Sequence, residues 1–120
     1  LWVTSGPGTR GYVGPLCLPH VGPCLQCVLD RFRLLSPEPE LYDLTIAHAR
    51  AGGAIAPTGF AGHGLAMLLS LARLKLELAA QARVDAAVYR LHVLETATLE
   101  VTSHRVFADP ECAACGRYGA

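Results

Sequence analysis

The densest run of apolar residues lies between Gly62 and Ala82 and predicts a long helix. Leucines, alanines and one methionine occupy positions on nearly every side of this segment, so no wide polar stripe remains. A helix that is apolar nearly all round is normally buried. We therefore expect its charged residues on a narrow wet face or at an exposed end: Arg73, Lys75, Glu77 and Arg83.

A second helix is predicted after Ser36-Pro37-Glu38. Ser36 can cap it, Pro37 suits its first turn, and Glu38 favours the positive end of the helix dipole. The glycine pair at 52–53 ends this segment. Residues 24–35 predict a turn followed by a third, shorter helix.

Extended segments lie at both ends of the chain. Residues 1–23 are rich in glycine and proline and predict a loop with short extended pieces at Tyr12-Val13 and Leu16–Leu18. Later, β-branched and aromatic residues predict a strand over Val88–Leu94. Alternating apolar and polar residues predict a half-exposed strand from Leu99 towards Phe107. Helices with a short strand pair place the chain in the α/β class.

The composition narrows the classes of function. The 120 residues suffice for one domain, and hydrophobic residues (52%) far exceed charged ones (17%), which excludes a disordered chain. Ten basic residues balance ten acidic ones, so a strongly basic nucleic-acid binder is excluded. The longest apolar stretch, Gly64–Ala72, is too short to cross a membrane. The first residues resemble part of a strand and not a signal peptide, so we expect a cytoplasmic chain that belongs to a larger protein or complex.

Two Cys-x-x-Cys pairs are the most specific feature: Cys24 with Cys27, and Cys112 with Cys115. Each pair can present two thiolates on one side of a tight turn, and two such turns can close a tetrahedral zinc site. Gly116, directly after Cys115, suits a positive φ that would point backbone N–H groups at sulfur. Four protein thiolates leave no open position on the metal, so this zinc would be structural and would join the two ends of the domain.

Other uses of these cysteines stay open. Disulfides would leave one of the five cysteines over, and nothing in the sequence indicates export. A redox Cys-x-x-Cys fits the position of Cys24 better than that of Cys112. An iron–sulfur cluster also uses four cysteines. Cys17 is expected to be a small buried apolar residue, with a reactive thiol as the alternative.

The sequence contains no recognisable catalytic or nucleotide-binding residues. None of the five histidines forms a known catalytic pattern, and we expect His92 and His104 on the exposed face of their strands. His63, between two glycines at the start of the long helix, is interpreted as a residue of a close-packed helix start. Two glycine-rich segments lack the spacing of a phosphate-binding loop.

The order of these features resembles the C-terminal half of the ThiF/MoeB superfamily of ubiquitin-activating-like adenylating enzymes. The matching motifs cover about residues 10–117 and are Gly22-Pro-Cys-Leu-Gln-Cys-Val-Leu29, the glycine-rich entry Ala56–Gly64 with its apolar helix, the strands near 88–107, and Asp109-Pro-Glu-Cys-Ala-Ala-Cys-Gly116. Arg10-Gly-Tyr-Val-Gly-Pro-Leu16 and Pro23–Arg31 are most similar to the ThiF-like component of azoline-forming cyclodehydratases, which act with a YcaO protein.

This resemblance implies a Rossmann-related fold of which residues 1–120 form a single zinc-binding C-terminal domain. It implies zinc ligation by Cys24, Cys27, Cys112 and Cys115. It also implies a non-catalytic role in presenting a ribosomal precursor peptide to a YcaO enzyme, which performs the ATP chemistry. The expected partners are YcaO, the precursor peptide, an N-terminal ThiF-like half and a second copy of the chain packed through the apolar helix. The alternative is half of an adenylating enzyme that activates a carboxyl terminus for sulfur transfer or conjugation.

Overall fold

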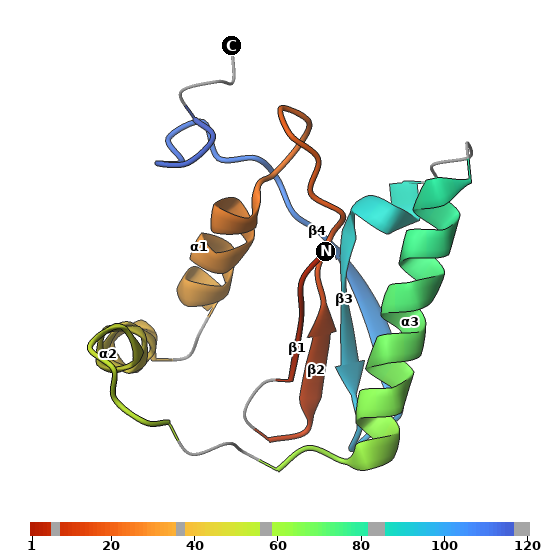
Figure 1. Cartoon of the computed structure of the whole chain (residues 1–120), viewed down its shortest axis with the longest axis horizontal. Helices are drawn as coiled ribbons and strands as arrows, with labels where there is room; N and C mark the ends of the chain where they lie inside the picture. The colour runs from red at the N-terminus through yellow and green to blue at the C-terminus, as the bar shows by residue number, and fades with distance from the viewer. Residues whose placement is uncertain (6–7, 36–37, 56–58, 82–85, 117–120) are drawn as a thin grey trace.

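Four strands and three α-helices make up the part of the fold that the structure describes (Figure 1). The structure, a computed structural model, describes residues 1–5, 8–35, 38–55, 59–81 and 86–116. The strands form one antiparallel sheet in the order β1-β2-β3-β4. Their bounds are β1 (Val3–Ser5), β2 (Arg10–Val13), β3 (Arg90–Glu95) and β4 (Glu100–Arg105). The helices are α1 (Leu25–Leu35), α2 (Pro39–Arg50) and α3 (Gly62–Ala80), with a 3-10 turn η1 at Ala86–Tyr89.

The mixed helix and strand class predicted from the sequence is confirmed. The strand pair expected late in the chain is β3–β4, and the glycine-rich start supplies two further strands where mainly loop was predicted. Every strand pair in the described residues is antiparallel, so the Rossmann-related, ThiF-like arrangement stays a prediction. None of the described helices is both long and apolar enough to cross a membrane.

Helix α3 lies along one face of the sheet (Figure 1). Leu68 is 1% exposed and packs against Val13 of β2 and Leu94 of β3. Gly11 permits this close approach, because a β-carbon there would overlap the Leu68 side chain. The glycine on the strand and the leucine on the helix together set how closely α3 packs on the sheet.

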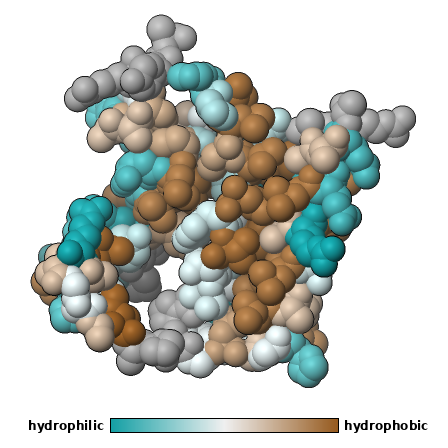
Figure 2. Space-filling model, viewed as in Figure 1, coloured by the Kyte–Doolittle hydropathy of each residue, from teal (hydrophilic) through white to brown (hydrophobic). Residues whose placement is uncertain are grey.

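Most of the apolar surface of α3 faces outward, so the prediction of a helix buried nearly all round is wrong. Only four of its residues are buried, and they recur every three or four positions: Gly64, Leu68, Ala72 and Lys75. Four leucines and the methionine of α3 are about half exposed, between 47% and 51%: Leu65, Met67, Leu69, Leu74 and Leu76. Figure 2 shows apolar atoms gathered along α3. The physical reason is that α3 contacts a single layer, which covers one stripe of a helix. The helix ends at Ala80, and the predicted end at Ala82 lies outside the described residues, as does Arg83.

Lys75 belongs to the buried stripe and not to the wet face that was predicted. It is 4% exposed, and its ammonium group donates hydrogen bonds to the carbonyl oxygens of Gly14 (2.6 Å) and Arg90 (2.8 Å). Its third neighbour is Nδ1 of His92 at 3.1 Å. His92 is therefore half-buried on the α3 side of β3, whereas His104 is exposed as expected. Burial lowers the pKa of Lys75 to about 8, and burial together with the nearby ammonium lowers the pKa of His92.

The opposite face of the sheet packs against α1. Val28 of α1 is buried with Leu91 of β3 and Val106. Phe32 of α1 meets two aromatic rings of the sheet edge-on, Trp2 at 5.2 Å and Tyr12 at 4.8 Å between ring centroids. This aromatic cluster fixes α1 against β1 and β2.

Helix α2 begins later than predicted. Pro39 is its first residue and Glu38 stands at the capping position without a side-chain capping bond, while Ser36 and Pro37 lie outside the described residues. None of the described α2 residues is buried, and Asp43 receives two hydrogen bonds of 2.7 Å from Arg33 of α1. Proline fits the first helical turn equally well at either position, because that turn has no partner for its N–H groups.

The burial of one predicted strand also needs correction. All six residues of β4 are exposed, so the predicted half-exposed strand is wrong in its burial, because α3 does not extend over this outer strand. The short extended piece predicted at Leu16–Leu18 lies outside the four strands of the described residues, and Leu18 forms an isolated bridge with Val21.

Candidate metal centre

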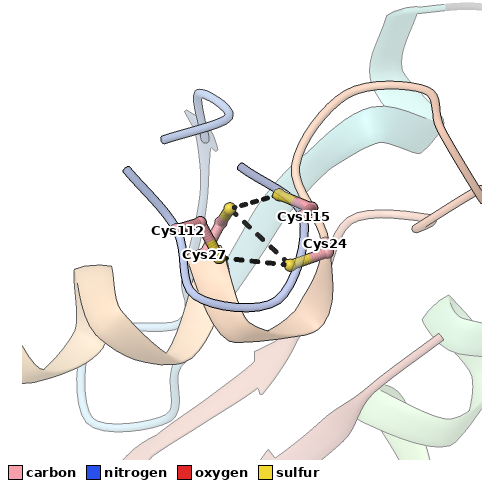
Figure 3. A group of neighbouring side chains, drawn as sticks. All are labelled: Cys24, Cys27, Cys112 and Cys115. Atoms are coloured by element: carbon pink, nitrogen blue, oxygen red, sulfur yellow. Dashed lines mark hydrogen bonds between the residues drawn. The ribbon is translucent and has the colours of Figure 1, made fainter. Parts of the chain in front are cut away.

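The four cysteines of the two Cys-x-x-Cys pairs converge on one point (Figure 3). Their sulfur atoms all lie within 4.8 Å of one another. Cys24 Sγ lies 3.7 Å from the sulfur of Cys27 and 3.7 Å from that of Cys112, and Cys27 Sγ lies 3.4 Å from that of Cys115. The described residues hold one such group of possible metal ligands, and it is the group that the sequence predicted.

These separations can be tested against coordination geometry. A tetrahedral site with metal–sulfur bonds of about 2.3 Å places its sulfur atoms about 3.8 Å apart. The three separations of 3.4–3.7 Å approach this value. A disulfide would need sulfur atoms about 2.0 Å apart, and all five cysteines are free. A cluster of several irons would have to fit its sulfides between the thiolates, whereas the observed spacing suits one ion.

The first cysteine pair is shaped by the start of α1. Cys24 directly precedes the helix and Cys27 lies in its first turn, so both sulfur atoms sit at the helix N-terminus. The carbonyl of Cys24 accepts the hydrogen bond of Val28 N–H at 3.2 Å, which closes this first turn. The positive end of the helix dipole favours thiolates at this place.

The second pair lies in a tight turn after β4. Cys112 N–H donates to the Asp109 carbonyl at 3.1 Å, and Gly116 N–H donates to the Cys112 carbonyl at 2.8 Å. A β-carbon on Gly116 would lie 2.6 Å from the Cys112 oxygen and 2.9 Å from its nitrogen. Gly116 has no positive φ, so the predicted reason for this glycine is wrong. Close approach of the backbone around Cys112 requires it instead.

Backbone N–H groups lower the pKa of these thiols, whereas burial raises it and a neighbouring sulfur can raise it too. The N–H groups of Cys115 and Ala114 lower the pKa of Cys112 to about 7. Contact with the sulfur of Cys27, and then with that of Cys24, raises the pKa of Cys115 to about 12. Burial raises the pKa of Cys27 although Asp109 N–H donates to its sulfur at 3.5 Å. Because metals bind thiolates, a divalent cation at the centre would favour the deprotonated form of all four.

Cys17 stands outside this group. It is half-buried, packs beside the Val28 cluster, and points its sulfur at the Pro15 carbonyl at 3.5 Å. Burial raises its pKa, which disfavours the reactive thiolate. His63 is exposed at the first turn of α3. Neither residue joins the cysteine cluster.

No family can be assigned from known proteins. No protein-family model matches the chain, and neither the curated proteins nor the solved structures contain a match. The metal centre therefore rests on its own geometry.

The contacts of Lys75 with the sheet were not predicted from the sequence. The available signal was phase: Lys75 follows Gly64, Leu68 and Ala72 at helical spacing, so it lies on the stripe that faces the sheet. Its charge alone suggested exposure.

Proposed function

We propose that the chain is a zinc-stapled, ThiF-like accessory domain that acts in a peptide cyclodehydratase and performs no chemistry itself. The observation that carries this proposal is the convergence of Cys24, Cys27, Cys112 and Cys115 within 4.8 Å. The resemblance of the motifs around both cysteine pairs to the ThiF-like partners of YcaO enzymes supports the remainder. In this role the domain helps to present a ribosomal precursor peptide for azoline formation.

The metal would cross-link two segments that lie far apart in the sequence. Its ligands come from the start of α1 and from the turn after β4, and each cross-segment sulfur pair spans 88 positions of the chain. Zinc coordinated by four thiolates has no free position for water or substrate, so it supplies stability and no Lewis-acid chemistry. The free energy of metal binding becomes free energy of folding, because the unfolded chain has no preformed site.

The link also fixes a surface suited to an accessory role. A groove of about 940 Å³ lies between the sheet and α1, and Trp2, Tyr12 and Phe32 line it. Since Cys27 and Phe32 both lie in α1 and Cys24 directly precedes it, the metal would hold one wall of this groove in place. A peptide-presenting domain needs such a rigid surface more than it needs catalytic groups.

Metal content tests the first part of the proposal. We expect one zinc ion per chain by elemental analysis, and loss of this zinc with a lower unfolding temperature after Cys112→Ser. Cys17→Ser is the matched control and should keep both zinc content and stability, because Cys17 lies outside the cluster. Iron in place of zinc, or no metal together with disulfides, would refute the zinc centre.

Reconstitution tests the second part. In a mixture of a YcaO enzyme, ATP and a precursor peptide, the peptide should lose water faster when the zinc-loaded chain is added. Mass spectrometry measures this loss of water. The chain without YcaO should show no ATP–pyrophosphate exchange. Exchange by the chain itself would instead favour the adenylating alternative, and no effect on YcaO would refute the accessory role.

A further inference from the structure

Strand β4 presents a free edge. It pairs only with β3, it is the outermost strand of the sheet in the described residues, and all six of its residues are exposed. Apolar side chains beside and within it face solvent, with Leu99 80%, Val101 52% and Phe107 59% exposed. Such an edge offers unpaired N–H and C=O groups to an added strand.

The charges at the two ends of β4 lack matching charges within the sheet. Glu100 stands opposite Glu95, and Arg105 stands opposite Arg90. Like charges directly opposite one another disfavour a strand pair. Glu95 is neutralised by Arg10 at 3.0 Å, whereas among the described residues Glu100 accepts a bond from the Thr98 hydroxyl at 3.2 Å and forms no ion pair.

Arg105 is likewise left without a carboxylate. Its guanidinium lies 5.0 Å from the centre of the Phe107 ring, and the ion pairs among the described residues do not include it. The free edge of β4 thus carries an unmatched anion at one end and an unmatched cation at the other. A complementary strand would place a cation opposite Glu100 and a carboxylate opposite Arg105.

The groove beneath β4 suits the side chains of such a strand. Thr102 and His104 of β4 line it on the open side, and Arg31 of α1 adds a cation to its lining. Arg31 forms no ion pair within the part of the chain that the structure describes. Alternate side chains of an added strand would point into this groove, since side chains alternate between the faces of a sheet.

We propose that the free edge of β4 binds an extended peptide as a fifth strand, with its carboxylate opposite Arg105 and its cation opposite Glu100. Backbone pairing supplies the attraction and the two end charges set the register. The inference rests on the proposed function only in that the partner is a peptide. It requires no YcaO enzyme and no chemical step.

A two-by-two charge exchange tests the site on the zinc-loaded chain. The probes are two synthetic peptides, Glu-Thr-Val-Thr-Val-Lys and Lys-Thr-Val-Thr-Val-Lys, and the proteins are the natural chain and Arg105→Glu. Amide NMR shifts measure affinity and place the peptide. The Glu/Lys peptide should bind the natural chain about fivefold more tightly than Arg105→Glu, and the Lys/Lys peptide should show the reverse preference. The Glu/Lys peptide matches both end charges of the natural chain only when it runs antiparallel to β4, whereas the Lys/Lys peptide matches the two acidic ends of Arg105→Glu in either direction.

Two controls sharpen the outcome. Arg73→Glu makes the same charge change on the exposed side of α3 and should leave both affinities unchanged. A backbone N-methylated Glu/Lys peptide should not bind, since it cannot form the ladder.

Shifts outside β4 and the groove, equal affinities in all four combinations, or binding of the methylated peptide would overturn the proposal. A β4-dependent dimer of the chain that excludes the peptide would also overturn it, in favour of a second copy at this edge. Failure of YcaO stimulation with intact peptide binding would refute only the proposed function.

Discussion

Replacing Lys75 with methionine should destabilise the protein by an amount that depends on pH. The ammonium group supplies hydrogen bonds to two carbonyl oxygens and lies beside His92 Nδ1. Methionine fills a similar volume but donates nothing. These three groups, one buried and two part-buried, would lose their donor, which costs about 5 kcal/mol together, taking 1–3 kcal/mol for each.

The buried charge opposes this loss. Burial lowers the pKa of Lys75 from 10.5 to about 8, so a charged Lys75 costs the folded state about 3 kcal/mol relative to the unfolded chain. Methionine removes that cost. The expected net destabilisation of Lys75→Met at pH 7 is therefore about 2 kcal/mol.

The sign of the pH effect follows from proton binding. Between pH 8 and pH 10.5 the unfolded chain keeps the Lys75 proton that the folded chain has lost. Stability rises with pH wherever the unfolded state binds more protons, so the natural protein gains about 2 kcal/mol from this group between pH 7 and pH 9.5. The variant lacks the group and cannot gain it. The difference between the two proteins should grow to about 4 kcal/mol at pH 9.5.

Urea unfolding at the two pH values, followed by the fluorescence of Trp2, measures this difference. Arg73→Met, on the exposed side of α3, is the control and should cost little at either pH. A difference that stays constant or shrinks as pH rises would refute the assigned burial of the charge.

Three further substitutions test other parts of the structure. Gly116→Ala should weaken zinc binding about tenfold in competition with a chelator, because its β-carbon would press on the Cys112 backbone; unchanged affinity would contradict the tight turn. Leu68→Ala should cost about 3–4 kcal/mol in urea unfolding, since the side chain is 1% exposed at the centre of the α3 contact. A cost below about 1 kcal/mol would mean that α3 packs less closely on the sheet. Arg33→Met should change stability by less than about 1 kcal/mol, because its pair with Asp43 is exposed on both sides; a larger loss would assign the α1–α2 contact a structural role.

The four-cysteine cluster was predictable because its signal is chemical and local. Each Cys-x-x-Cys spacing places two sulfur atoms on one side of a turn, and this holds whatever fold surrounds it. A site that uses four thiolates for one ion requires the two pairs to meet. The reason for Gly116 was not predictable, since it depends on where the backbone of the turn passes.

The burial of the helices was harder to predict. The apolar residues of α3 gave its start correctly at Gly62, but composition does not say how many layers a helix contacts. Lys75 was predicted to be exposed because its side chain is charged. Its spacing from Leu68 along the helix, however, places it on the side that faces the sheet. Strand β1 was predicted only in part: the first residues resemble part of a strand, but the observed strand covers Val3–Ser5, and three residues give too short a pattern to fix its bounds.

The separation of the two cysteine pairs along the chain has a consequence during protein synthesis. Cys24 and Cys27 leave the ribosome 88 positions before the residues they meet, Cys112 and Cys115. At about 5–20 residues per second this delay lasts roughly 4 to 18 s. Throughout that interval the first two thiols are without their partners and open to oxidation or to a transient metal. Correct maturation therefore depends on the reducing power of the compartment in which the chain is made and, for the zinc site that we propose, on its zinc supply.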